Sequence, residues 1–381
     1  MSVIKRTVAV VLAVACGLVA FAAPASAADA PWRMVSAGFR HACAVGPTGA
    51  LWCWSGSNYW GQVGSGDTDA HDYPVRVGNQ SNWASVSAGG LHTCGLKMDG
   101  TRFCWGGNNY GQLGIGDQTN RNAPRQWLGE TKWLSVSAGI YHSCGVQVDH
   151  RLYCWGLNSS GELGVGDTTD RNLPAQVGTQ ANWASVSAGG EFTCALKTDG
   201  TRYCWGLNDH GQLGLTDKHN RNAPIRVLNE GAWSSISAGA ADACGVRPDQ
   251  TIRCWGENGT GQDGTGDTTE HDMPVVVGGG HSWSSVSVGG GFAETCAITT
   301  DAIRFCWGYG LGGALGTGTA TSSFLPVALG GDGTWSQVSA GTGFACGLPA
   351  SGGVFCWGDN DWQQLGVGFD PQYALLPLQT L

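Results

Sequence analysis

The chain has 381 residues, and its composition already restricts what it can be. It contains 63 Gly and 13 Pro, so residues that favour turns are plentiful. Twenty Lys and Arg stand against 29 Asp and Glu, a formal net charge of −9, and no basic stripe appears. Such a chain repels phosphate backbones, which argues against a nucleic-acid partner.

Residues 1–27 have the pattern of a secretory signal peptide. Lys5 and Arg6 form a positive start, Val8 to Ala23 is apolar, and Ala25 to Ala27 is an A-x-A cleavage site. One alternative is a membrane anchor, but the apolar run has roughly 16 residues and a membrane span needs ~20. The other is lipoprotein cleavage at Cys16, but the residues before this cysteine, Ala13 to Ala15, fit such a cleavage site poorly. We expect a secreted, extracellular protein with no membrane span after cleavage.

Removal of this segment leaves 18 basic and 29 acidic residues, a net charge near −11. The remaining chain, 28–381, contains no segment with the composition of a linker and no change of composition that would mark a second domain. We therefore expect one domain of about 50-residue repeats and a monomer.

A repeat of about fifty residues runs through this domain, and fourteen of the fifteen cysteines mark it. One Trp opens each unit: Trp32, Trp83, Trp133, Trp183, Trp233, Trp283 and Trp335. The cysteines form seven evenly spaced pairs: Cys43 and Cys53, Cys94 and Cys104, Cys144 and Cys154, Cys194 and Cys204, Cys244 and Cys254, Cys296 and Cys306, and Cys346 and Cys356. A second Trp follows each pair: Trp54, Trp105, Trp155, Trp205, Trp255, Trp307 and Trp357. A fixed period of this size indicates a solenoid, a propeller or an array.

The second unit shows the expected elements in chain order. Short β-rich runs cover Trp83 to Ala88, His92 to Lys97 and Arg102 to Trp105, with an Asp-Gly turn between the last two. A fourth run follows the proline, at Arg125 to Leu128. No unit has a 3.6-residue apolar period long enough for a helix. Four strands in each of seven units predict an all-β fold, a seven-bladed β-propeller.

The G-Q-L-G-x-G-D stretch at Gly111 to Asp117 resembles the regulator of chromosome condensation repeat, and the resemblance spans Trp32 to Leu381. It implies a seven-bladed propeller and says little about activity, because one scaffold hosts many functions. Some family members bind chromatin, a role that conflicts with the negative net charge of this chain. Others act in nucleotide exchange on a cytosolic GTPase, a role that conflicts with the export that we expect. We expect the last strand, Leu378 to Leu381, to pair with the first, Trp32 to Ala37, and so to close the ring without a bare sheet edge.

The cysteine spacing predicts one disulfide in each blade. Cys94 and Cys104 lie five residues on either side of Asp99, so they face each other across the hairpin. An even number of cysteines in an exported chain favours oxidation. Free thiols are the alternative. Metal is disfavoured because each blade offers only two ligands, so we expect no metal site and no cofactor.

Two short windows vary among the units while Trp, Gly, Cys and Pro stay fixed. They are 39–40, 90–91, 140–141, 190–191, 240–241, 290–294 and 342–343, and 57–60, 107–110, 157–160, 207–210, 257–260, 309–314 and 359–362. Strand direction places both on one face, opposite the Asp-Gly turns. That face would carry Phe39, Arg40, Tyr59, Trp60, Tyr110, Tyr141, Glu191, His210, Tyr309 and Trp362, together with Glu294. Aromatic residues and Arg are enriched at binding hot spots, so we predict a binding face; loop drift is the alternative.

Other polar positions are expected to be structural. His41, His92 and His142 share a position that Phe192, Asp242 and Phe344 take elsewhere, so hydrogen bonding is favoured over a metal cluster. The repeated Gly-Asp turns, with Arg four residues later in the middle units, are expected to be capped turns with local ion pairs, calcium being the alternative.

The sequence contains no G-x-S-x-G, no H-E-x-x-H and no phosphate-binding loop, so we assign no catalytic residue. We predict a secreted non-enzymatic module that binds an extracellular protein. A lectin-like binder of glycans is the second hypothesis and an enzyme the third. The chain is similar in architecture to secreted β-lactamase inhibitory propellers but carries seven cysteine pairs and longer loops, which leaves the target open.

Overall fold

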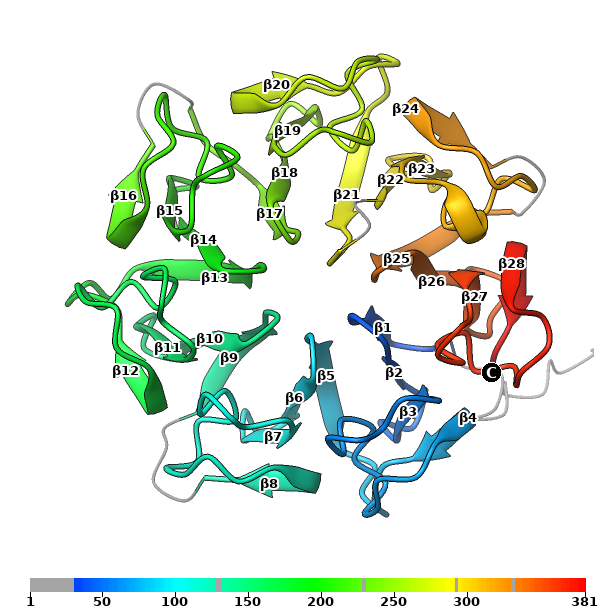
Figure 1. Ribbon diagram of the computed structural model, residues 1–381, viewed down its shortest axis with the longest axis horizontal. Coiled ribbons are helices and arrows are strands. Elements are labelled where there is room, and N and C mark those ends of the chain that lie inside the picture. The colour runs from blue at the N-terminus through cyan, green and yellow to red at the C-terminus, as the bar shows by residue number, and fades with distance from the viewer. Residues whose placement is uncertain (1–30, 128–131, 228–230, 292–293, 330–332) are drawn as a thin grey trace, which may run out of the picture.

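The computed structural model describes residues 31–127, 132–227, 231–291, 294–329 and 333–381. Seven four-stranded antiparallel sheets stand around a central axis like the blades of a wheel (Figure 1). The predicted all-β, seven-bladed propeller is confirmed. The predicted signal peptide, 1–27, lies outside these residues, and within them no helix combines the length and apolar character that a membrane crossing requires.

Each blade is built from four strands that are consecutive in the chain, the first nearest the axis (Figure 1). The first strands are β1 (Met34–Ala37), β5 (Trp83–Ala88), β9 (Trp133–Ala138), β13 (Trp183–Ala188), β17 (Ser235–Ala238), β21 (Trp283–Val288) and β25 (Trp335–Ala340). The second strands are β2 (Ala42–Val45), β6 (His92–Lys97), β10 (His142–Gln147), β14 (Phe192–Lys197), β18 (Asp242–Val246), β22 (Glu294–Thr299) and β26 (Phe344–Pro349).

The third and fourth strands complete the blades toward the rim. The third strands are β3 (Leu51–Ser55), β7 (Arg102–Gly106), β11 (Leu152–Gly156), β15 (Arg202–Gly206), β19 (Ile252–Gly256), β23 (Arg304–Gly308) and β27 (Phe355–Asp359). The fourth strands are β4 (His71–Arg76), β8 (Arg121–Gln126), β12 (Arg171–Gln176), β16 (Arg221–Arg226), β20 (His271–Val276), β24 (Ser323–Ala328) and β28 (Tyr373–Gln379). One 3₁₀ turn, η1 (Leu311–Gly313), is described.

The fourth strand begins before the proline of each unit, so its predicted start was wrong. In the second blade β8 begins at Arg121, and Pro124 lies inside it. Proline lacks the N–H that a further strand would need, and it is accepted here because the fourth strand pairs only with the third. The rim therefore consists of seven short edges, each interrupted by a proline, which discourages pairing with other chains.

The predicted closure of the ring by strand exchange was also wrong. β28 pairs with β27 in the seventh blade, and β1 pairs only with β2 in the first. The first unit begins with an inner strand and the last ends with an outer one, so both blades are complete without exchange. Side-chain hydrogen bonds join them instead: Ser339 Oγ accepts from Ala37 N at 2.9 Å, and Trp54 Nε1 donates to Gln364 O at 2.8 Å.

The same two bonds repeat at every seam between neighbouring blades. A serine of each first strand accepts from the next blade's backbone at 2.9–3.0 Å, which explains why the S-x-S-A-G stretch is repeated. The second Trp of each blade donates its indole N–H to a carbonyl of the preceding blade at 2.8–3.1 Å. The seam between blades 7 and 1 is thus built like the other six.

All seven predicted disulfides are present, one in each blade, and each joins the second strand to the third. In chain order Cys43 is bonded to Cys53, Cys94 to Cys104, Cys144 to Cys154, Cys194 to Cys204, Cys244 to Cys254, Cys296 to Cys306, and Cys346 to Cys356. The two cysteines of every bridge are direct partners in the strand register, with Cα–Cα distances of 4.0–4.2 Å. The pairing predicted from the hairpin geometry is therefore confirmed in every blade.

The disulfides form one side of the core between blades. Every bridged sulfur is buried against the two tryptophans of the next blade, as Cys94 and Cys104 are against Trp133 and Trp155. The hydrophobic core therefore consists of separate layers between neighbouring blades. In each layer a disulfide of one blade packs against two indoles of the next. Seven bridges indicate an oxidising compartment.

Candidate functional site

The two variable windows of each blade lie side by side at one end of the propeller. The loop after the third strand hydrogen-bonds the loop after the first: Gly107 N donates to Leu91 O at 2.8 Å, and Leu157 N donates to Tyr141 O at 3.0 Å. The equivalent bond recurs in blades 4, 5 and 7. The variable loops thus form one face, which we call the loop face, as the strand directions predicted.

Side chains that recur from unit to unit hold these loops in shape. In the second blade Asn108 Oδ1 accepts from Leu113 N, and Gln112 Oε1 accepts from Tyr110 N, at 2.9 and 3.0 Å. The adjoining turn is capped by Asp117, whose carboxylate pairs with Arg121 at 2.6 Å. The predicted structural role of the Gly-Asp turns is confirmed for this blade and for the two that follow.

A repeated geometry brings together residues of neighbouring blades on the loop face. At three seams the residue six positions after a blade's second cysteine lies against the residue three positions before the next blade's first cysteine. Tyr110 meets Tyr141 edge to face at 5.4 Å between ring centroids, and Ser160 Oγ donates to Glu191 Oε2 at 2.8 Å. Across the closing seam Arg40 lies over the ring of Trp362, 4.2 Å from its centroid. We call such a pair a seam pair.

The predicted aromatic residues follow the ring as a continuous arc rather than a single cluster. We define the aromatic arc as the seven aromatic members of the predicted face, which lie on blades 6, 7, 1, 2 and 3: Tyr309, Trp362, Phe39, Tyr59, Trp60, Tyr110 and Tyr141. These blades adjoin in this order in Figure 1. Tyr59 is 74% exposed, and Tyr110 and Trp362 are each 37% exposed, while the other four are partly buried.

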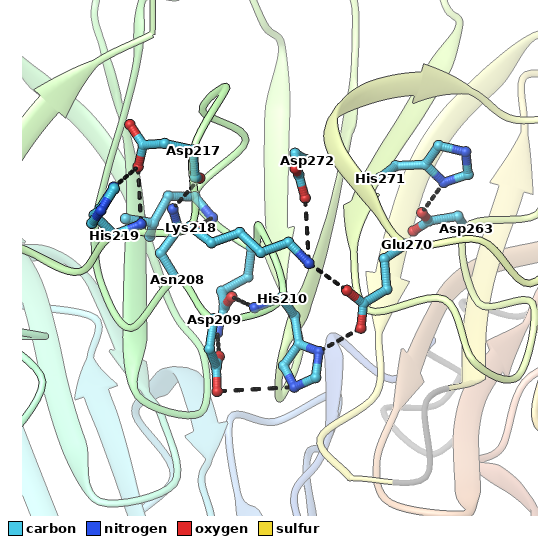
Figure 2. Close-up of polar contacts among 12 residues, drawn as sticks. Asn208, Asp209, His210, Asp217, Lys218, His219, Asp263, Glu270, His271 and Asp272 are labelled. Carbon is cyan, nitrogen blue, oxygen red and sulfur yellow. Dashed lines mark hydrogen bonds and ion pairs between the residues drawn. The ribbon is translucent and has the colours of Figure 1, made fainter.

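Blades 4 and 5 continue the loop face with charged side chains (Figure 2). His210 Nδ1 lies 2.7 Å from one oxygen of Glu270, and Lys218 Nζ lies 2.6 Å from the other. The hydrogen bond that His210 donates to Glu270 raises the pKa of His210, and Lys218 and His210 together lower the pKa of Glu270. The predicted residue His210 is therefore part of an ion-pair network that links two blades.

Glu294 does not lie on the loop face, and its predicted placement there was wrong. It is fully buried at the start of β22, where its Oε2 accepts from Gly343 N at 3.2 Å. It occupies the position that His92 holds in the second blade, two residues before the first cysteine. The insertion in this unit lies before Glu294, in a stretch that includes the undescribed residues 292–293, and hides this correspondence in the sequence.

The shared histidine position is structural, as predicted. His41, His92 and His142 are buried at the seams, and each Nε2 hydrogen-bonds a Thr or Ser hydroxyl of the next blade at 2.7–2.8 Å. Burial lowers the pKa of His92 and His142 to about 3 and that of His41 to about 4, so all three are neutral near pH 7. In the described residues no three His, Cys, Asp or Glu side chains gather as metal ligands.

Four carboxyl groups are buried, which the sequence analysis did not predict. Asp242 and Glu294 occupy the histidine position, Asp263 stands where other blades have Leu or Val, and Glu162 stands where most have Gln. Burial raises the pKa of all four, that of Glu162 to about 7. Asp263 Oδ2 shares a hydrogen bond with His271 Nδ1 at 2.9 Å (Figure 2). Comparison of the units shows that these acidic residues replace others, but their burial depends on how neighbouring blades pack.

The residues that the structure describes line an axial hollow and a larger one at this end of the molecule. The axial one is lined by Ala and Gly at and just after the ends of the first strands, together with Phe39, Ile140 and Val288, and has a volume of ≈ 90 Å³, room for about three waters. A larger one of ≈ 380 Å³ opens at the seam of blades 6 and 7, where Tyr309 faces residues of the seventh blade. Of the two, the larger hollow has room for a side chain or a small ligand.

The fold and its loop face define the class of the protein: a seven-bladed propeller whose repeated sheets carry loops that differ in sequence from blade to blade. The chain belongs to the RCC1-like domain family, whose model matches residues 19–293, and a regulator of chromosome condensation (RCC1) repeat matches residues 335–361. The resemblance seen in the repeat is thereby confirmed.

Relatives and solved structures agree with this assignment. The chain is 39% identical over 75 residues to the ultraviolet-B receptor UVR8 of Arabidopsis thaliana and 37% identical over 81 residues to the human E3 ubiquitin-protein ligase HERC2. These matches cover 19% and 20% of the chain and 17% and 2% of the two relatives, so the chain spans less than a fifth of their length.

Similar solved structures share the fold at low sequence identity. Yeast RCC1 (Prp20), solved with Kap60, superposes with a TM-score of 0.78 at 18% identity, covering 99% of this chain and 91% of that one. Human WBSCR16 gives 0.74 at 19%, covering 84% and 87%. The CRINKLY WD40 ectodomain of the Arabidopsis thaliana receptor kinase ACR4 gives 0.53 at 21%, covering 91% and 99%.

Proposed function

We propose that this protein is a secreted, non-enzymatic binding module that holds an extracellular protein against the aromatic arc of its loop face. The observation that carries the proposal is the arc itself: seven aromatic side chains on five adjoining blades, in loops that differ among otherwise near-identical repeats. Large, stiff rings lose little conformational entropy on binding and dominate the energetics of protein interfaces.

Export is part of the proposal and rests on the pattern of residues 1–27 and on the seven disulfides. A plant ectodomain has the same fold, so a propeller of this kind is compatible with an extracellular position. A protein partner is favoured because the solved relatives include yeast Prp20 in complex with Kap60. We propose cleavage after Ala27 and a mature propeller of residues 28–381.

The test is affinity capture from the culture medium with three forms of the protein. The first is wild type, the second carries Tyr59→Ala, Tyr110→Ala and Trp362→Ala, and the third is a matched control with Tyr73→Ala, Leu173→Ala and Met273→Ala. The control residues are also exposed but lie on the fourth strands at the rim. A partner retained by wild type and control and lost by the arc variant supports the proposal.

Equal recovery by all three forms would contradict it. A glycan array distinguishes the lectin-like alternative, in which the same rings would stack on sugars. Glycan binding that depends on the arc, with no protein retained, would replace the protein partner by a carbohydrate.

A further inference from the structure

At one seam of the loop face both positions of the seam pair are glycine. At the seam of blades 2 and 3 the seam pair is Tyr110 and Tyr141, and at the closing seam it is Trp362 and Arg40. At the seam of blades 6 and 7 the two corresponding positions are Gly312 and Gly343. Both glycines line the ≈ 380 Å³ hollow, so a pocket opens where side chains meet elsewhere.

Local backbone structure keeps this pocket open. Gly312 lies in η1 with φ of +65°, a conformation that disfavours any residue with a side chain. On the other side β27 and β28 pair one residue further than the third and fourth strands of other blades, which places Asp359 directly opposite Tyr373. The pocket is thus bounded by a glycine-rich turn of blade 6 and by a paired strand end of blade 7.

The side chains around the pocket are aromatic and acidic. Tyr309 comes from blade 6, and Asp359, Asp361 and Tyr373 come from blade 7, while none of the described lining residues carries a positive charge. Tyr373 is 49% exposed, so a ligand can reach its ring. Tyrosine rings and carboxylates attract the same kind of group, because the face of the ring and the carboxylate are both negative.

The electrostatics of the site point the same way. Asp359 Oδ1 accepts from Asp361 N at 2.9 Å, so the two acidic residues are held next to each other. Burial, with a contribution from Asp361, raises the pKa of Asp359. Burial also raises the pKa of Tyr309, and the charge of Asp359 adds to that shift. A positive charge bound in the pocket would relieve the repulsion between these groups.

We propose that the pocket between blades 6 and 7 accepts a cationic side chain, the guanidinium of an arginine or the ammonium of a lysine. The source of that side chain, a protein held on the loop face, rests on the function proposed above. The affinity of the pocket for a cation does not, because it follows from the two rings, the two carboxylates and the volume. A sugar could stack on the same rings but would leave the two acidic charges uncompensated.

The experiment uses the full-length exported protein and N-acetyl-L-arginine methylamide as the probe, with the neutral isostere N-acetyl-L-citrulline methylamide as its control. Binding is followed by saturation-transfer NMR and isothermal calorimetry at low salt and at high salt. Asp361→Asn and Tyr373→Ala test the pocket, and Tyr73→Ala, which removes an exposed rim tyrosine that does not line it, is the matched control. Asp361→Asn alters only an exposed side chain and keeps the backbone bond to Asp359.

We expect the arginine probe to bind wild type and Tyr73→Ala equally, with affinity falling about tenfold in each pocket variant and with salt. The citrulline probe should not bind. Binding that is absent, or equal in wild type and both pocket variants, would overturn the proposal, as would a preference for methyl glucoside over the arginine probe. The probe experiment contains no protein partner, so a negative result in it does not contradict the proposed function. A negative capture experiment likewise does not contradict the cation site.

Discussion

The guanidinium of Arg40 lies over the indole of Trp362, 4.2 Å from the ring centroid, and joins the first blade to the last. The two residues are 322 positions apart in the chain, yet they occupy the same relation as Tyr141 and Tyr110, which are 31 apart. The seam pair is therefore a property of the ring and not of the chain order. It also means that the loop face is continuous across the point where the chain begins and ends.

A double-mutant cycle with Arg40→Met and Trp362→Leu should give a coupling energy of about 0.5–1 kcal/mol, the usual worth of a partly exposed cation–π contact. Stability is measured by denaturant unfolding at pH 7. Tyr59→Ala, which removes an exposed ring, should change stability by less than about 0.5 kcal/mol. Additive single effects would mean that the stack does not hold the seam.

Trp105→Phe should lower the free energy of unfolding by about 1–3 kcal/mol, because it removes the indole N–H that bonds Gln62 O and leaves space beside a buried disulfide. Trp52→Phe is the control, since Trp52 lies in the same kind of strand but is partly exposed. Thermal melting by circular dichroism compares the two variants. Equal melting temperatures would show that the inter-blade indole bond contributes little.

The disulfides should resist reductants as long as the protein is folded. Both sulfurs of each bridge are fully buried, so a thiolate cannot attack them without local or global unfolding. Thiol titration should therefore detect few free thiols in dithiothreitol alone and many once denaturant is added. Removing one bridge with Cys94→Ala and Cys104→Ala should cost roughly 2–3 kcal/mol, the value for closing a loop of about eleven residues.

His92 should make the protein less stable in acid. Burial lowers its pKa to about 3, with small contributions from His41 and His142, so the folded state takes up this proton far less readily than the unfolded state. Stability from this group is complete above about pH 6.5 and is lost as the pH falls toward 3, by about 2 kcal/mol at pH 5. His92→Phe should remove that loss, and Phe192 and Phe344 show that the position accepts Phe. Unfolding curves at pH 5 and 8 measure the difference, and a variant with the pH dependence of wild type would contradict it.

Glu294 should have the opposite effect. Its burial, with a smaller contribution from Asp242, raises its pKa well above the usual value, so the folded state holds this proton more tightly than the unfolded state. Stability from this group is present in acid and is lost as the pH rises above about 4.5. Glu294→Gln should therefore stabilise the protein more at pH 8 than at pH 4. Equal effects at both pH values would mean that the carboxyl is ionised in the folded protein.

Much of the frame could be predicted from repetition alone. The position of Asp99 midway between Cys94 and Cys104 predicted the hairpin, its register and the disulfide, all of which depend on local geometry. The bounds of β5 and β6 were also predicted correctly, because alternating residues and turn signals act within a few positions. The outer strand was placed too late, since Pro124 resembles a breaker and is acceptable only in a strand with one free edge.

The candidate site was predictable only in outline. Strand directions placed Tyr110 and Tyr141 on the same face, but their contact depends on how one blade sits against the next. Glu294 was assigned to the surface because two inserted residues concealed its correspondence with His92. The pocket at Gly312 and Gly343 could not be predicted from either loop, because it arises from two missing side chains on different blades.

By itself the sequence determined seven copies of one β-sheet, a disulfide inside each, and an acidic, turn-rich chain. These features follow from the spacing of the repeated residues, the even number of cysteines in the repeats and the residue composition. The tertiary structure decided how the units meet: which carbonyl each indole bonds, how the ring closes without exchanging a strand, and where two glycines leave a hollow between neighbours. The reason is physical. Contacts such as the disulfide inside a unit join residues about ten positions apart, so the local sequence pattern predicts them. Contacts between units depend on the angle and distance at which whole sheets pack.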